Sequence, residues 1–173
     1  ENFYNALLEG KSGIGPITRF DASDYATRIA GEVKDFDITQ YGVDKKEARR
    51  MDRSVEFAIG AAVLAADDAK LALDEEDLDR CGTVVGTGIG GIDSIHEVYT
   101  TLFDKGPGRV SPFAVPMMIA NMSSARVSIR LGLKGPVITD VTACTSGTNA
   151  IGDAFRIIQR GDADIKIGRA SCR

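Results

Sequence analysis

One segment of the chain, residues 137–147, constrains the fold more than any other because its pattern changes part-way along. Its first part, Val137-Ile138-Thr139-Asp140-Val141, is rich in β-branched residues, which favour a strand. Small residues then carry a single cysteine, Cys144, directly into a helical pattern. The sequence therefore predicts a strand-to-helix corner that places a thiol at the positive end of a helix. The dipole and the backbone N–H groups there favour the thiolate.

Two interpretations of Cys144 are open at this point. A thiolate at such a corner can act as a covalent nucleophile. Cysteines outside disulfides, however, are among the most often buried residues and mostly serve as small core hydrophobes. The local pattern alone favours the second interpretation, and the rest of the chain has to decide between them.

Strands and helices alternate through the second half of the chain. The strands are expected at residues 83–86, 136–142 and 163–167, and the helices at 54–73, 92–103, 116–131 and 148–159. Pro116 is suited to begin the third of these helices, and Gly132 to end it. Alternation of this kind predicts an α/β fold with a sheet covered by helices.

The first third of the chain is less regular. We expect a short helix at residues 3–9, a Gly/Pro loop at 11–18, a candidate strand at 29–33 and a charged surface segment at 44–52.

Composition excludes several classes of function. The 173 residues suffice for one domain with a sizeable core, and the net charge of −4 comes without a basic stripe, so we expect no nucleic-acid partner. We expect no signal peptide and no membrane span, because no apolar run is long enough. The three cysteines, Cys81, Cys144 and Cys172, form no CxxC pair or His/Cys cluster, so neither a disulfide framework nor a metal site is expected. This cysteine usage fits the reducing cytoplasm.

A glycine-rich turn offers a competing function. Gly86-Thr87-Gly88-Ile89-Gly90-Gly91 matches the dinucleotide-binding pattern G-x-G-x-x-G and lies between an expected strand and an expected helix. A nicotinamide- or flavin-dependent oxidoreductase is therefore an alternative. That fingerprint also needs a strand ending on an acidic residue about 20 positions later, and residues 108–112, Gly-Arg-Val-Ser-Pro, supply none. The glycines are better explained by a tight turn and close backbone packing.

A series of motifs in one order identifies the family. They are Gly10-Lys11-Ser12-Gly13-Ile14, the turn at 86–91, Ser111-Pro112-Phe113, Val115-Pro116, Asn121-Met122, Gly132-Leu133-Lys134-Gly135-Pro136 and Thr142-Ala143-Cys144-Thr145-Ser146-Gly147. Together they resemble the β-ketoacyl-[acyl-carrier-protein] synthases, closest to the type II elongating enzymes of fatty-acid biosynthesis. The resemblance extends over about residues 1–165.

The resemblance implies a thiolase-like fold with α-β-α-β-α layers, of which this chain would hold an incomplete N-terminal half, and a homodimer in the parent protein. It implies an acyltransferase without a cofactor of its own, whose substrates are carried on the phosphopantetheine of acyl carrier protein. Cys144 would accept the acyl chain as a thioester, and its backbone N–H would form one arm of the oxyanion hole. Decarboxylative Claisen condensation with malonyl-carrier protein would follow.

Further residues take roles from the resemblance one at a time. Ile89 would gate the acyl-chain pocket, Val115 would reach the partner subunit's acyl pocket, and Ala143 would pack beside the nucleophile. Ala114 stands where the family often has a second Phe, which would widen the pocket or loosen the dimer contact. For each of these positions ordinary packing is the alternative interpretation. His96 is the only histidine of the chain and precedes Cys144, whereas the family's two catalytic histidines follow the cysteine, so His96 receives no catalytic role.

The expected domain organisation is a partial N-terminal ketosynthase domain at residues 1–165, followed by a non-native tail at 166–173. The tail, Lys166-Ile167-Gly168-Arg169-Ala170-Ser171-Cys172-Arg173, is polar where a buried central strand is expected, so we predict that it does not complete the sheet. Without the two histidines, the isolated chain is expected to be unable to condense its substrates.

Two further alternatives stay within the fold. One is a ketosynthase domain of a polyketide pathway. The other is a non-catalytic partner subunit that resembles a chain-length factor, although such subunits lack the nucleophile and Cys144 argues against that assignment.

Overall fold

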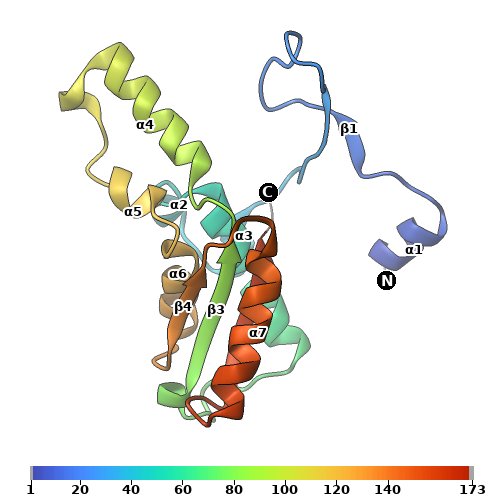
Figure 1. Cartoon of the computed structure of the whole chain (residues 1–173), viewed down its shortest axis with the longest axis vertical. Coiled ribbons are helices and arrows are strands. Elements are labelled where there is room, and N and C mark those ends of the chain that lie inside the picture. The colour runs from blue at the N-terminus through green and yellow to red at the C-terminus, as the bar shows by residue number, and fades with distance from the viewer. Residues whose placement is uncertain (1, 172–173) are drawn as a thin grey trace. The chain divides into compact units, whose positions relative to one another are not determined.

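The computed structural model of the protein describes residues 2–171. The chain forms two compact units, Glu1–Asp37 and Ile38–Arg173 (Figure 1). The first unit contains a helix and a two-stranded sheet, and the second contains the three-stranded sheet with its covering helices.

The first unit begins with helix α1 (Asn2–Leu8), which ends at Gly10 in the left-handed conformation that glycine favours (φ 66°). Strands β1 (Ile14–Pro16) and β2 (Ile29–Gly31) then pair antiparallel. Strand β2 confirms the strand expected at 29–33. Strand β1 corrects the loop expected at 11–18, because pairing with a distant segment creates it.

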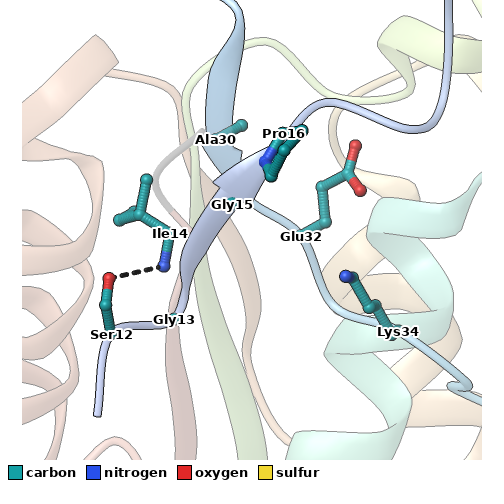
Figure 2. A pocket seen from close by; sticks show the side chains of 8 residues that line it. All are labelled: Ser12, Gly13, Ile14, Gly15, Pro16, Ala30, Glu32 and Lys34. Atoms are coloured by element: carbon teal, nitrogen blue, oxygen red, sulfur yellow. Dashed lines mark hydrogen bonds between the residues drawn. The ribbon is translucent and has the colours of Figure 1, made fainter.

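A small cavity of about 120 Å³ lies within this first unit (Figure 2). It is lined by residues 12–16 together with Ala30, Glu32 and Lys34. The Glu32 carboxylate accepts hydrogen bonds from the backbone N–H and the hydroxyl of Thr18, at 2.9 and 2.7 Å. The carboxylate thus holds the two arms of the β1–β2 hairpin together.

The sheet of the second unit has the order β4-β3-β5, and all three strands are parallel. The central strand, β3 (Cys81–Thr87), is buried along its whole length. It pairs with β4 (Val137–Asp140) from Thr83↔Val137 to Gly86↔Asp140. A parallel strand that is buried on both faces consists of an unbroken run of apolar or small residues. This explains the sequence of β3, Cys-Gly-Thr-Val-Val-Gly-Thr.

Helices cover both faces of this sheet (Figure 1). On one face, α7 (Ser146–Gln159) packs Ala150 and Ile157 against Val84 of β3. The other face carries α3 (Arg53–Asp68) and α6 (Met122–Leu131), which also contact each other. The remaining helices are α2 (Lys45–Ala48), α4 (Ile92–Lys105) and α5 (Ala114–Met118), with 3-10 turns at Ile38–Tyr41, Leu78–Arg80, Pro107–Arg109 and Ala143–Thr145. This arrangement confirms the expected α/β layering.

The prediction of a single helix at residues 116–131 is wrong. Helices α5 and α6 are separate, and Ile119 between them is extended (φ −69°, ψ 137°). The break lets the backbone of Gly90 approach, since a Cβ on Gly90 would lie 2.9 Å from the Cα of Ala120. A tertiary contact therefore interrupts a helical pattern that looks continuous in sequence. Gly132, in the left-handed conformation, ends α6 as predicted.

The helix expected at 54–73 is also too long. Helix α3 ends at Asp68, and Lys70 adopts the left-handed conformation with φ 51°. The N–H of Leu71 then bonds back to the carbonyl of Ala66 at 3.0 Å, which closes the helix. The start of the helix brings a second correction: Asp52, expected on a charged surface segment, is only 1% exposed.

The predicted failure of residues 166–173 to complete the sheet is wrong as well. Strand β5 (Ile165–Ser171) pairs with β3 over its full length, from Cys81↔Ile165 to Thr87↔Ser171. Lys166 is half-buried, and its ammonium group donates to the carbonyl of Pro136, which gives this polar residue a partner beside the sheet. The non-native origin of the tail stays a prediction, and residues 172–173 lie outside the described part.

An ion pair joins the beginnings of β3 and β5. The Arg80 guanidinium donates to both carboxylate oxygens of Asp164, at 2.5 and 2.6 Å, and to the carbonyl of Gly161 at 3.0 Å. The Arg80 hydrogen bond lowers the pKa of the Asp164 carboxyl below its ordinary value. This bidentate pair holds the turn between α7 and β5 against the central strand.

Within residues 2–171, no helix combines the length and the apolar character needed to cross a membrane. The same residues hold no group of three or more His, Cys, Asp or Glu side chains arranged to bind a metal ion.

Candidate active site

The predicted strand-to-helix corner is present. Strand β4 ends at Asp140, the 3-10 turn Ala143–Thr145 follows, and α7 begins at Ser146. Cys144 lies in the middle of this turn and is exposed, whereas Cys81 on β3 is buried and only 1% exposed. Burial raises the pKa of the Cys81 thiol, as do the acidic groups around it. Cys81 is therefore the core hydrophobe, and Cys144 is presented to solvent at the start of a helix.

The turn that carries Cys144 is strained. Ala143 has φ 52°, in the left-handed region that residues with a Cβ rarely adopt. Such a conformation costs on the order of 1–2 kcal/mol and persists only where surrounding bonds enforce it. Here Thr142 supplies several of those bonds: its carbonyl accepts from the N–H and hydroxyl of Thr145, and its hydroxyl accepts from the Asn149 amide at 2.8 Å.

Ser146 holds the same turn from inside the protein. Its side chain is fully buried (0% exposed), and its hydroxyl oxygen accepts from the N–H of Thr142 at 2.8 Å. The hydroxyl lies within donating distance of two carbonyls, Ala143 at 2.8 Å and Thr87 at the end of β3 at 2.9 Å. The corner is thus bonded to the central strand as well as to itself.

Gly86 makes this close approach possible. A Cβ at residue 86 would lie 2.2 Å from the carbonyl oxygen of Ser146 and 2.7 Å from the nitrogen of Gly147. These are backbone atoms, which cannot move away without distorting the chain. The end of β3 can therefore pack this closely against the start of α7 only with glycine at residue 86.

The rest of the glycine-rich turn lies beside the corner. A Cβ on Gly88 would be 4.0 Å from the carbonyl oxygen of Ala143, and Gly90 (φ 97°) donates its N–H to the hydroxyl of Thr87 at 3.2 Å. Ile89 between them is 60% exposed. The structure therefore brings the turn that carries Ile89 next to the turn that carries Cys144.

The other residues singled out from the sequence lie on α4 and α5 or directly beside Cys144. Val115 is 62% exposed on α5, the helix whose Met117 and Met118 carbonyls contact Gly91 and Gly90. Its neighbour Ala114 is buried and lines a cavity of about 150 Å³ together with residues of α4. Ala143 is exposed beside Cys144, and His96 is exposed on α4.

A buried carboxylate occupies the place that a dinucleotide would need. Asp52 Oδ1 accepts from the N–H and hydroxyl of Ser54, at 2.8 and 2.7 Å, at the start of α3. Its Oδ2 accepts from the N–H and hydroxyl of Ser94, at 2.9 and 2.8 Å, in the first turn of α4. Pyrophosphate in a dinucleotide fold binds at the N-terminus of the helix after the glycine-rich turn. In this protein a side-chain anion already holds that position, which argues against the oxidoreductase alternative.

Asp140, at the end of β4, is not among the site residues predicted from the sequence. Among the described residues, its Oδ2 is buried without a hydrogen-bond partner. Burial, followed by the neighbouring carboxylate of Asp153 on α7, raises the pKa of the Asp140 carboxyl. The strand before the corner therefore ends on an acid that is costly to ionise.

Sequence reasoning missed the supporting residues of this site, namely Asp52, Thr87 and Ser146. Two of them carry a recognisable signal. Asp52-Arg53-Ser54 has the acid and hydroxyl pattern of a helix start, and Ser146 follows the cysteine at the first residue of a helix. Their partners, Ser94 and Thr87, are 42 and 59 residues away along the chain, so only the fold could reveal them.

Comparison with known proteins fits this geometry. The family described as "Beta-ketoacyl synthase, N-terminal domain" matches residues 1–168. The chain belongs to the beta-ketoacyl synthase family. Among curated relatives of this family, it is 55% identical over 167 residues to the 3-oxoacyl-[acyl-carrier-protein] synthase 2 of Synechocystis sp., covering 96% of this chain and 40% of that protein. It is 52% identical over 160 residues to the Staphylococcus aureus protein of the same name, covering 92% of this chain and 40% of that protein.

Solved structures confirm the thiolase-like fold of this beta-ketoacyl synthase chain. The ishigamide ketosynthase/chain length factor has a TM-score of 0.82 at 29% identity, covering 99% of this chain and 43% of that chain. A beta-ketoacyl synthase from Burkholderia phymatum has a TM-score of 0.78 at 27% identity, covering 92% of this chain and 40% of that chain. The chain thus spans about 40% of the length of the relatives it matches.

Proposed function

We propose that this chain is part of a 3-oxoacyl-[acyl-carrier-protein] synthase of fatty-acid biosynthesis and that Cys144 is its acyl-accepting nucleophile. The observation that carries the proposal is an exposed cysteine at a strained, multiply bonded strand-to-helix corner. A second cysteine in the same unit is buried in the core, so exposure at residue 144 reflects its position in the fold. The 55% identity to a protein of that name supports the same assignment.

The proposed first stage is acyl transfer. The Cys144 thiolate attacks the carbonyl carbon of a thioester carried on the phosphopantetheine of acyl carrier protein. The C–S bond to the phosphopantetheine breaks, its thiolate leaves, and a thioester to Cys144 forms. We expect the N–H of Cys144 itself, in the 3-10 turn that precedes α7, to donate to the oxyanion of the tetrahedral intermediate. No cofactor takes part.

The proposed second stage is decarboxylative Claisen condensation. Malonyl-carrier protein loses CO₂, and the resulting carbanion attacks the Cys144 thioester, which releases the thiolate and a β-ketoacyl product. This stage needs groups that stabilise the developing negative charge. The chain's one histidine, His96, is exposed on α4. We assign charge stabilisation to residues of the parent protein beyond this chain and expect the chain alone to be inactive in condensation.

The remaining expected roles belong to the same proposal. Ile89 gates the acyl-chain pocket, Ala143 packs beside the nucleophile, and Val115 reaches the acyl pocket of a second subunit in a homodimer. The exposure of Ile89 and Val115, at 60% and 62%, leaves both side chains available for such contacts. The protein acts in the cytoplasm, with acyl carrier protein as its partner.

Acylation of Cys144 tests this proposal directly. The chain is incubated with acyl carrier protein carrying an acyl thioester, and intact mass followed by peptide mapping locates the added acyl group. We expect the modification on Cys144, none on buried Cys81, and none in Cys144→Ala. Absence of acylation in the wild-type chain, or acylation that persists in Cys144→Ala, would overturn the assignment.

A polyketide ketosynthase is the second candidate, since one structural relative is a ketosynthase/chain length factor. Identity of 29% to that chain, against 55% to a 3-oxoacyl-[acyl-carrier-protein] synthase, favours the fatty-acid enzyme. Efficient acylation by saturated acyl groups, with little from polyketide intermediates, would separate the two.

A further inference from the structure

The turn that carries Cys144 and the turn that carries Ile89 are bonded to the same residue of β3. Thr87 accepts at its carbonyl from the buried Ser146 hydroxyl at 2.9 Å, and its own hydroxyl accepts from the N–H of Gly90 at 3.2 Å. Thr87 and Ser146 are both buried, at 4% and 0% exposed. A hydrogen-bonded connection between the two turns therefore runs through two buried hydroxyl-bearing residues.

We propose that Ser146 is a positioning residue for the nucleophile. Its hydroxyl fixes the Cys144 turn against the end of β3 and, through Thr87, against the Ile89 turn. The proposal rests on the proposed role of Cys144 and adds a residue whose function is geometric. The side chain of Ser146 is fully buried, so its proposed action is on the residues that hold Cys144 in the turn.

The contacts of Ser146 support a positioning role. Its hydroxyl oxygen accepts from Thr142 N–H, and its single proton is shared between the carbonyls of Ala143 and Thr87. These bonds reach both residues that precede Cys144 in the turn. Ala143 is held at φ 52°, a conformation that relaxes unless neighbouring bonds prevent it. Removing the hydroxyl takes away a side-chain hydrogen bond that ties this turn to the central strand.

Removal of the Ser146 hydroxyl should displace the Cys144 sulfur from the geometry that acyl transfer needs, while the thiol stays accessible to small reagents. Acyl transfer needs the sulfur, the thioester carbon and the oxyanion-hole N–H in register, and a displacement of about 1 Å can cost on the order of a hundredfold in rate. Alkylation by a small reagent has no such requirement, because Cys144 is exposed. A positioning role therefore affects the first reaction and spares the second.

The test compares Ser146→Ala with wild type in both reactions. We expect the maximal rate of Cys144 acylation from acyl carrier protein to fall about tenfold to a hundredfold. The carrier concentration for half-maximal rate should stay unchanged, and iodoacetamide alkylation of Cys144, followed by peptide mapping, should stay within about twofold. Ser146→Thr keeps a hydroxyl and should recover part of the rate.

Ser128→Ala is the matched control. Ser128 is also a buried helical serine, 8% exposed, and its hydroxyl donates to a carbonyl, that of Leu133 at 2.7 Å. It lies near the end of α6, so a general packing loss would affect both variants alike. We expect Ser128→Ala to lower the unfolding midpoint but to leave Cys144 acylation unchanged.

The outcomes are distinguishable. Failure of wild type to acylate Cys144 contradicts the proposed function. Normal acylation in Ser146→Ala, or an equal loss in Ser128→Ala, overturns the positioning role alone. If Ser146→Ala does not unfold cooperatively, Ser146→Cys replaces it, because a thiol has the same shape as the hydroxyl group at slightly larger size and forms weaker hydrogen bonds; peptide fragmentation then assigns the acyl group to residue 144 or 146. An unchanged acylation rate in that variant would equally overturn the inference.

Discussion

Replacing Asp52 by Asn tests whether one carboxylate holds the starts of two helices. Asp52 is 1% exposed and accepts four hydrogen bonds, two from Ser54 at the start of α3 and two from Ser94 in the first turn of α4. An amide of the same shape can satisfy only one helix, because its NH₂ group must face either Ser54 or Ser94. The hydroxyl of that serine can rotate to accept a hydrogen bond from the asparagine NH₂ group. The backbone N–H of the same serine, however, would face this NH₂ group, which is also a donor, and would lose its acceptor.

The magnitude follows from the lost bonds. A hydrogen bond to a charged group contributes about 1.5–3 kcal/mol, and a carboxylate at a helix N-terminus adds about 0.3–1 kcal/mol at each helix. We expect Asp52→Asn to lower the free energy of unfolding by about 2–4 kcal/mol. For a chain of 173 residues this corresponds to a fall of roughly 5–15 °C in the midpoint of thermal unfolding.

The assay is urea and thermal unfolding followed by far-UV circular dichroism. Asp44→Asn is the control, because Asp44 is the N-cap of α2 and accepts from Lys46 N–H and Glu47 N–H at 2.7 and 2.8 Å, but it is exposed and serves one helix only. Asparagine and aspartate are comparable N-caps, so Asp44→Asn should leave the urea midpoint nearly unchanged. Equal midpoints for Asp52→Asn and wild type would refute the double-capping argument.

Three further predictions concern single side chains. Asp140→Asn should raise the urea midpoint at pH 7, because burial and Asp153 disfavour the ionised Asp140 carboxyl; the gain should shrink as the pH falls through the raised folded-state pKa and disappear well below pH 3.8, where Asp140 is protonated in both states. A gain that is independent of pH would contradict this explanation. Arg80→Met should lower the midpoint more at pH 7 than at pH values well below 3.8, since the lowered pKa of Asp164 stabilises the fold only while that carboxyl is ionised in the folded state, whereas the bond to the Gly161 carbonyl does not depend on pH; a difference of the same size at both pH values would rule out the ion pair as its source. Ile89→Phe in the longer parent protein should shift acyl-chain preference toward shorter chains, as measured by product length, and an unchanged profile would remove Ile89 from the gating role.

The candidate nucleophile could be located from sequence because its signal is local. β-Branched residues before Cys144 and a helical pattern after it lie within a few residues of the thiol, and the structure places Cys144 between β4 and α7 as expected. The surroundings of the thiol could not be located in this way. Ser146 bonds to Thr87 and Asp52 bonds to Ser94 across 59 and 42 residues, and no periodic pattern encodes those pairings.

The errors have a common physical origin. The helix expected at 116–131 is broken where Gly90 packs against Ala120, and the tail expected to leave the sheet joins it because β3 offers an open row of backbone groups. In both cases the local preference of a segment was weaker than a contact made by a distant one. The backbone N–H and C=O groups of a buried strand need hydrogen-bond partners, which β5 provides for β3. Lys166, a polar residue of β5, finds its own partner in the carbonyl of Pro136.

By itself, the sequence determined the α/β class, the family and the corner that carries Cys144, because short-range periodicity and ordered motifs specify these features. Only the tertiary structure decided which cysteine is exposed, which acid is buried and which hydroxyl holds the corner. Burial and hydrogen-bond partners depend on which distant segments meet. That is settled by packing around β3, where glycine at residue 86 allows α7 to begin directly against the strand that supports it.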